Sequence, residues 1–215
     1  MSKRILLVAA TELELAPLRS FLEEKEQVTV LVAGIGGVST AYGLTRQLAR
    51  ERYDLVLQAG IGGSLVQQYA PGSIAVIDSE CFGDLGVNEN GQWRSVFDLG
   101  LAVPDDPPFT KGWLRNPYEE LMALTRLNRA KGVTNNEITT REDMLRQFKD
   151  NLRAEIESME GAAFHYVALN EGVPFLQIRA VSNYVGERDK AKWKLRESIS
   201  LLNATVQQLI TVILQ

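Results

Sequence analysis

Residues 157–183, ESMEGAAFHYVALNEGVPFLQIRAVSN, decide how the rest of the chain is interpreted. The small residues that follow Glu160 predict a helix that lies close against a sheet. The run before Ser182 is too apolar to have a solvent face, so it predicts a buried strand. Met159 and Glu160 stand where the helix opens, and Ser182 and Asn183 follow the carboxyl end of the strand. Open α/β sheets bind their ligands at that edge.

These two motifs resemble the nucleoside phosphorylase and nucleosidase superfamily, and in particular its hydrolytic members. That family carries Met-Glu at the start of a helix of small residues and, further along, Arg-x-x-Ser-Asp or Arg-x-x-Ser-Asn. The matching residues here are Met159, Glu160, Arg179, Ser182 and Asn183.

The resemblance implies an α/β fold in a single domain over residues 1–215. This fold has three αβα layers, in which helices cover both faces of a central mixed and partly closed β-sheet. The Ser-Asn-Tyr at 182–184, with an Arg/Lys/Trp-containing segment behind it, is also similar to one branch, the futalosine hydrolases of menaquinone biosynthesis.

Composition limits the kinds of molecule that the protein is expected to bind. A chain of 215 residues with 45% hydrophobic residues can bury one core, and no linker divides it. The net charge of −4, without a basic stripe, argues against nucleic acid and favours a small ligand. Cys81 is the sole cysteine, and no Cys/His spacing suits zinc, so we expect no metal and no cofactor. No apolar run is long enough for a membrane span, and we expect a cytoplasmic protein.

Glu14 has two interpretations. Thr11 and Glu14 match a helix capping box, which by spacing alone favours a structural role. The resemblance implies that the last carboxylate of the acidic cluster, here Glu14, positions the attacking water. Glu12 is the alternative if the helix is rotated.

Two glycine-rich segments follow strands. Residues 34–37 lead into a helix and offer backbone N–H groups to an anion or a sugar. They lack the full dinucleotide fingerprint, so a nicotinamide cofactor is not expected. The second segment, 60–64, is predicted to form a turn at the end of a strand. Gly60 and Ile61 there have no nearby cation, which favours a bound water over a phosphate.

Other substrate contacts follow from position or from the resemblance. Thr134 and Glu137 are candidates for contacts to the base, and Ser182 belongs to the substrate-binding motif. Arg188 and Lys192 would bind a carboxylate on the substrate, although a solvated helix face is the default for such charges. Trp193 would form a wall. In the family, the loop-rich region 79–118 contributes to a neighbouring subunit, which implies a homo-oligomer.

The chemistry assigned to these residues is N-ribosidic hydrolysis. Glu160 would bind the ribose hydroxyls and stabilise the cationic sugar, while Glu14 takes a proton from water on the opposite face. Met159 would pack against the sugar. Asn183 can donate to a 6-oxo group and accept from N7–H, which suits hypoxanthine. Relatives that cleave 6-aminopurine nucleosides carry Asp there.

The sequence therefore predicts hydrolysis of futalosine to hypoxanthine and dehypoxanthinyl futalosine. The first alternative is a methylthioadenosine/adenosylhomocysteine or aminodeoxyfutalosine nucleosidase. A purine nucleoside phosphorylase and a non-catalytic nucleoside-binding module are further alternatives.

Overall fold

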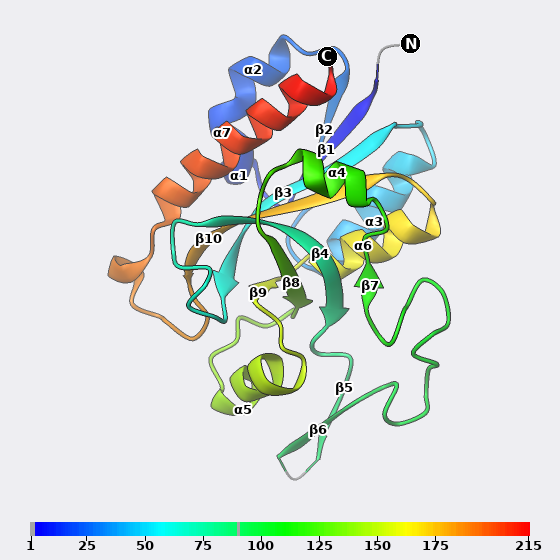
Figure 1. Cartoon of the computed structure of the whole chain (residues 1–215), viewed down its shortest axis with the longest axis vertical. Coiled ribbons are helices and arrows are strands. Elements are labelled where there is room, and N and C mark those ends of the chain that lie inside the picture. Colours follow the sequence, from blue (N-terminus) through cyan, green and yellow to red (C-terminus); the bar gives the residue numbers. More distant parts are fainter. Residues whose placement is uncertain (1–2, 90) are drawn as a thin grey trace.

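A computed structural model describes residues 3–89 and 91–215 (Figure 1). Its strands are β1 (Ile5–Ala9), β2 (Val28–Val32), β3 (Leu55–Ser64), β4 (Ile74–Phe82), β5 (Gly86–Glu89), β6 (Gln92–Ser95), β7 (Leu114–Arg115), β8 (Arg129–Thr134), β9 (Ile156–Ser158) and β10 (Phe175–Tyr184). Its α-helices are α1 (Glu12–Leu15), α2 (Arg19–Glu23), α3 (Gly37–Leu48), α4 (Glu119–Leu124), α5 (Glu142–Arg146), α6 (Gly161–Asn170) and α7 (Leu195–Ile213).

The main sheet is mixed and partly closed. Its strand order is β10-β4-β8-β9-β3-β1-β2, and β10 also pairs with β3, so five of the strands form a ring. The long strand β3 makes this possible because it pairs with β1 over its first residues, with β9 over its last, and with β10 along most of its length. The predicted central sheet is confirmed.

Helices cover both faces of the sheet, as Figure 1 shows. Leu6 and Leu7 are neighbours in β1, and their side chains belong to opposite cores because successive strand residues alternate in direction. Leu7 packs in the core that contains Leu202 and Val206 of α7. Leu6 packs in the core that contains Phe164 of α6 and residues of α3. The predicted three-layer α/β architecture is confirmed.

The second glycine segment differs from its prediction. Residues 60–64 are not a turn but the second half of β3. A Cβ on Gly60 would collide with Nη1 of Arg179, and one on Gly62 would come 2.9 Å from the Glu157 carbonyl oxygen. Glycine is needed here because neighbouring strands and a buried guanidinium approach the backbone closely, and no chain reversal is involved.

The end of β10 also extends beyond its prediction. The strand continues to Tyr184, so Ser182 and Asn183 lie within it and not after it. Its register against β3 shifts between Val181 and Asn183. Irregularities of this kind redirect side chains and recur beside active sites.

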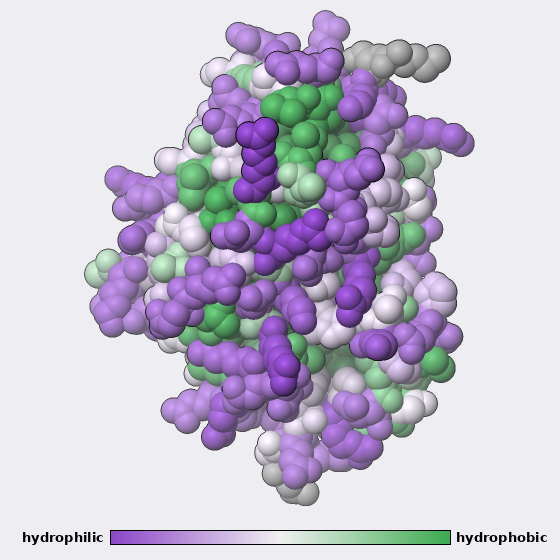
Figure 2. Space-filling view, in the orientation of Figure 1, coloured by the Kyte–Doolittle hydropathy of each residue, from purple (hydrophilic) through white to green (hydrophobic). Residues whose placement is uncertain are grey.

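Hydrophobic surface on the face shown in Figure 2 gathers mainly in its upper half, the part occupied by α4 and α7 in Figure 1. Leu124 of α4 and Val212 of α7 are among the exposed hydrophobic residues. Within residues 3–89 and 91–215, none of the helices has both the length and the apolarity that crossing a membrane requires.

Candidate active site

A cavity of about 350 Å³ lies where α1, β3, β9 and β10 meet. Eight of the residues singled out from the sequence line it: Glu14, Ile61, Met159, Glu160, Ser182, Asn183, Arg188 and Trp193. They come from segments far apart in the chain, and the sheet topology brings them together.

Glu14 forms the predicted capping box and also lines the cavity. Its Oε2 accepts the Thr11 N–H at 3.0 Å and the Thr11 hydroxyl at 3.2 Å, which completes the capping box. Its Oε1 accepts the Ile61 N–H at 3.0 Å. A carboxylate offers about four acceptor positions, so one remains on the cavity side for a water molecule. The same hydrogen bonds hold the carboxylate in place.

Glu160 stands at the N-cap position of α6 and is 6% exposed. Its Oε1 accepts the Gly36 N–H at 3.1 Å, and its Oε2 lies 3.7 Å from Nη2 of Arg179. Arg179 is 1% exposed and also donates to Oε1 of Gln58 at 3.0 Å. A Cβ on Gly60 would meet both Arg179 and, at 3.0 Å, Oε1 of Glu14, so this buried cation lies near Glu14 as well as Glu160. It offsets part of the repulsion between them.

The Asn183 amide is held in one orientation. Its Oδ1 accepts the Ser182 hydroxyl at 2.7 Å, and its Nδ2 donates to the Tyr184 carbonyl oxygen at 2.9 Å. A carbonyl oxygen can only accept, so the amide nitrogen must face Tyr184. One N–H and one oxygen lone pair remain for a ligand.

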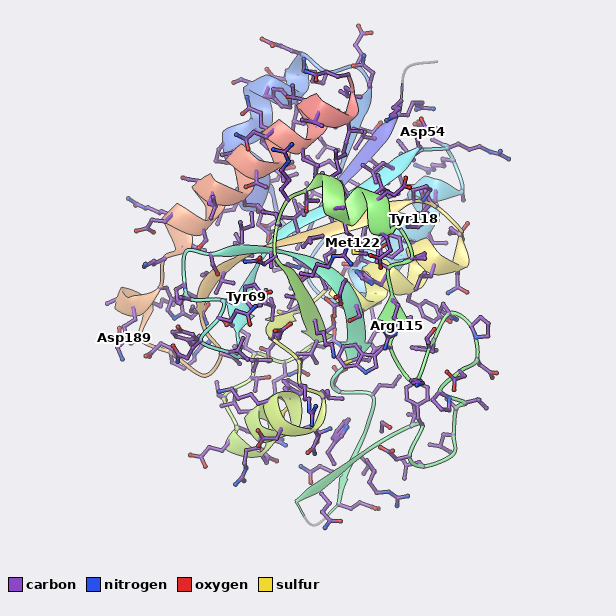
Figure 3. The ribbon with its side chains drawn as sticks, in the orientation of Figure 1. Asp54, Tyr69, Arg115, Tyr118, Met122 and Asp189 are labelled. Atoms are coloured by element: carbon purple, nitrogen blue, oxygen red, sulfur yellow. The ribbon has the colours of Figure 1, made fainter. Side chains whose placement is uncertain are left out.

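The far end of the cavity is formed by the segment that leads into α7. Arg188 lies 6.0 Å from the centre of the Trp193 ring, and the indole N–H donates to the Glu187 carbonyl oxygen at 3.0 Å. Asp189, labelled in Figure 3, accepts the Ala191 N–H at 3.0 Å in the same segment. An exposed arginine and a half-buried aromatic ring therefore stand together at the cavity rim.

Four predicted site residues do not line the cavity. Gly60 lies beneath it, between Glu14 and Arg179, as described above. Glu137 is exposed, and Lys192 is exposed and paired with Glu187 at 2.7 Å. Thr134 is fully buried, accepts the Ala162 N–H at 2.7 Å and donates to Glu80 at 3.1 Å. Thr134 thus supports the first turn of α6.

Glu12, the alternative to Glu14, also lies outside the cavity. Its carboxylate pairs with Arg19 at 3.1 Å, with both side chains well exposed. The helix orientation therefore brings Glu14, and not Glu12, to the cavity.

The first glycine loop uses its N–H groups within the protein. Gly36 donates to Glu160 at 3.1 Å, and Gly37 donates to Oδ1 of Asn136 at 3.2 Å. An anion at this loop would have to displace these side chains. The loop therefore positions Glu160.

A buried carboxyl, Glu80, lies beneath the start of α6. It accepts from Nε2 of Gln177 at 2.8 Å and from Thr134 at 3.1 Å. Burial raises the pKa of Glu80 from 4.5 to about 7, although these hydrogen bonds and the charge of Arg179 act in the opposite direction.

Two buried polar atoms near Glu80, Oε1 of Gln177 and Nε2 of His165, have no hydrogen-bond partner in the described part of the chain. Burial lowers the pKa of His165 to about 3, so the ring is neutral, and Nδ1–H donates to the Leu114 carbonyl oxygen at 3.0 Å. Turning the Gln177 amide over would let a protonated Glu80 donate to its oxygen and let its nitrogen donate to His165. The protonated form of Glu80 therefore satisfies the network.

This network leads to a prediction about stability. The pKa of Glu80 is higher in the folded than in the unfolded protein. The stability that the Glu80 carboxyl contributes is therefore fully present below about pH 4.5 and is lost as pH rises through about 7. Between about pH 5 and pH 8, the unfolding free energy of wild type should fall by ~2 kcal/mol more than that of Glu80→Gln. Urea unfolding of both proteins at the two pH values measures this difference. Equal losses in the two proteins would contradict it.

Several side chains of the site could not be given a role from the sequence. Arg179 belongs to a motif, but its complete burial between carboxylates could not be inferred from spacing. Asn203 of α7 donates to the backbone carbonyl of Glu14 at 2.8 Å and so anchors α1. Glu157 and Thr139 line the cavity. The only sign of Glu157 and Thr139 in the sequence was that they lie close to residues already singled out.

Comparison with known proteins shows which families this chain resembles. The family model described as "Phosphorylase superfamily" matches residues 17–215. A futalosine hydrolase of Streptomyces coelicolor is 33% identical over 86% of this chain and 79% of its own length. A futalosine hydrolase of Thermus thermophilus is 30% identical over 84% and 80%. A 5′-methylthioadenosine/S-adenosylhomocysteine nucleosidase of Listeria monocytogenes is 30% identical over 75% and 71%.

Solved structures agree on the fold. A 5′-methylthioadenosine/S-adenosylhomocysteine nucleosidase of Helicobacter pylori superposes with a TM-score of 0.83 at 16% identity, covering 99% of both chains. The corresponding Neisseria meningitidis protein also gives 0.83 at 16% identity, covering 98% of this chain and 99% of its own. As its motifs predicted, the chain belongs to the phosphorylase superfamily and is a hydrolase of N-glycosyl compounds.

Proposed function

We propose that the protein hydrolyses the N-ribosidic bond of futalosine, releasing hypoxanthine and dehypoxanthinyl futalosine, a step in menaquinone biosynthesis. The observation that carries the proposal is that Glu14, Glu160 and Asn183 share one cavity that ends at Arg188 and Trp193. The two futalosine hydrolase relatives support it. The position of the protein in the cell would be the cytoplasm.

The sugar would lie between the two carboxylates. Cleavage places positive charge on the ribose and negative charge on the departing base. Glu160 would accept hydrogen bonds from ribose hydroxyls and stabilise the cationic carbon, with Met159 packed against the ring. Glu14 would use its remaining acceptor position to take a proton from the attacking water.

The base would contact Asn183. Its free N–H would donate to a 6-oxo group, and its free lone pair would accept from N7–H as the base departs. Ser182 contributes by fixing the amide, because its hydroxyl donates to Oδ1 at 2.7 Å.

The 5′ substituent would reach the rim. Arg188 is the cation on the cavity wall and would bind a carboxylate there, while Trp193 provides an apolar surface. Lys192 is held by Glu187, and we leave it out of the proposed contacts.

The main alternative is a methylthioadenosine/adenosylhomocysteine nucleosidase, which the Listeria relatives favour. A direct assay separates the candidates: purified protein is incubated with futalosine, aminodeoxyfutalosine, methylthioadenosine and inosine, and the released base is measured by chromatography. Futalosine should be cleaved fastest, at a rate that does not depend on added phosphate. Faster cleavage of methylthioadenosine would overturn the futalosine proposal, and a phosphate requirement would make the enzyme a phosphorylase.

Asn183→Asp tests the base assignment. An aspartate keeps the bond from Ser182 and, when protonated, can deliver a proton to N7, but it cannot offer the amide N–H to a 6-oxo group. We expect the preference for futalosine over its 6-amino analogue to fall about 10- to 100-fold in kcat/KM. Asn128→Asp, an exposed site outside the cavity, controls for the added charge. An unchanged preference would remove the reason for choosing hypoxanthine.

We also propose a homo-oligomer. Exposed hydrophobic residues surround the cavity mouth: Leu13 at 59%, Ile35 at 60% and Ile138 at 54% line the cavity, and Val38 at 84% and Tyr42 at 66% lie on the adjacent α3. Burying such a patch against a second copy would stabilise an assembly. Sedimentation at micromolar concentration that gave only the monomer mass would exclude it.

A further inference from the structure

Asn203 ties the long helix α7 to the backbone of Glu14. Its Nδ2 donates to the Glu14 carbonyl oxygen at 2.8 Å and to the Ile199 carbonyl oxygen at 2.6 Å. Carbonyl oxygens only accept hydrogen bonds, so the amide nitrogen, and not Oδ1, must face both groups. The bond to Glu14 joins two residues that are 189 positions apart in the chain, at the point where α7 passes α1 (Figure 1).

The packing of α7 does not by itself call for an amide at this position. Asn203 is 3% exposed and stands between Leu202 and Val206, which belong to the core on this side of the sheet. Its Oδ1 is buried and has no hydrogen-bond partner in the described part of the chain. An unpaired buried acceptor is unfavourable. A leucine here would continue the apolar side of the helix and bury no polar atom.

The segment that carries Glu14 has few other ways to fix its own backbone. The helix α1 has only four residues, and the 3₁₀ helix Ala16–Leu18 follows it directly. Helices this short are not stable alone. Pro17, three residues after Glu14, has no N–H and cannot give the Glu14 carbonyl the i→i+3 bond of a 3₁₀ turn. Leu15 is buried, but apolar packing is non-directional. The Asn203 amide supplies a directed bond at this carbonyl.

The place of the Glu14 carboxylate depends on this backbone. Oε1 accepts from Ile61 of β3 at 3.0 Å and Oε2 from Thr11 at 3.0 Å, so the side chain bridges two elements. A shift of the Glu14 backbone would disturb both bonds. In catalysis, a misplacement of about 1 Å can lower the rate about 100-fold. Asn203 does not line the cavity, so it can act on this placement without touching the substrate.

We propose that Asn203 is a positioning residue for the hydrolysis. By holding the Glu14 carbonyl against α7, it fixes the point from which the Glu14 carboxylate takes a proton from water. This inference rests on the role proposed for Glu14, and it does not depend on which purine nucleoside is the substrate.

A double-mutant cycle tests the inference. The four proteins are wild type, Asn203→Leu, Glu14→Gln and the double variant, each assayed with the nucleoside that wild type cleaves fastest. In the wild-type background, Asn203→Leu should lower kcat about 10- to 100-fold and leave KM within about twofold. In the Glu14→Gln background, the same substitution should change kcat less than about threefold, because the group that it positions is already disabled.

Two further variants separate positioning from folding. Asn203→Ser can keep a hydrogen bond to the Ile199 carbonyl but is too short to reach Glu14, so its kcat should fall as in Asn203→Leu. Asn170→Leu is the matched control. Asn170 of α6 also donates from Nδ2 to a carbonyl four residues earlier, that of Tyr166 at 2.7 Å, but it is exposed and lies outside the cavity. Its kcat should stay within about twofold of wild type.

The outcomes distinguish this inference from the proposed function. If Glu14→Gln is slow while Asn203→Leu and Asn203→Ser keep wild-type kcat, Asn203 does not position Glu14 and the inference alone is wrong. It is also wrong if Asn203→Leu lowers kcat by the same factor in both backgrounds, because the loss then does not pass through Glu14. If Glu14→Gln keeps wild-type kcat, the proposed mechanism fails, and the inference fails with it. A substrate other than futalosine would overturn the futalosine proposal and leave the cycle valid.

Discussion

Glu160→Gln is expected to lower kcat by at least about a thousandfold, the largest effect that any single substitution in this site should produce. The glutamine can still accept the Gly36 N–H and can still bind ribose hydroxyls. It cannot place a negative charge beside the developing cation, so the loss should appear in kcat far more than in KM.

Arg179 makes the stability of this variant informative. Its guanidinium is buried 3.7 Å from Glu160 and would keep only the neutral Gln58 as a hydrogen-bond partner. We expect the unfolding free energy to fall by ~1–3 kcal/mol while the protein stays folded. Single-turnover rates, together with urea unfolding, separate the two effects. A folded variant with near-wild-type turnover would show that this carboxylate does not serve the reaction.

Glu14→Gln is expected to lower kcat by about 10²- to 10⁴-fold, the usual range for loss of a general base. The oxygen of the substituted side chain can keep the bond from Ile61, but its amide nitrogen would face the Thr11 donors and break the capping box. A moderate loss of stability, ~1 kcal/mol, should accompany the loss of rate.

Glu12→Gln is the matched control for this prediction. It removes a carboxylate from the same short helix, yet Glu12 is exposed and pairs with Arg19 outside the cavity. Its kcat should stay within about twofold of wild type. If Glu12→Gln is inactive and Glu14→Gln is not, the assignment of the water-binding carboxylate is reversed.

Local sequence determined the main secondary-structure elements and many of the residues that the site contains. The apolar run of β1, the small residues at the start of α6 and the Thr11–Glu14 capping box each depend on neighbours within one turn or strand, so they can be inferred from the sequence. The Met-Glu and Arg-x-x-Ser-Asn motifs marked Glu160 and Asn183 through their resemblance to a known family. These are the residues on which the family assignment and the proposed chemistry rest.

Tertiary structure alone decided which way the side chains face. Thr134 is polar and close to the motifs, yet the pairing of β8 with β9 and β4 turns it inward to Glu80. Glu157 was quoted within the first motif, and only the pairing of β9 with β3 brings it to the wall of the cavity. The direction of a strand residue depends on long-range pairing and on local irregularities such as the one at Ser182. No periodicity within a single segment encodes that information.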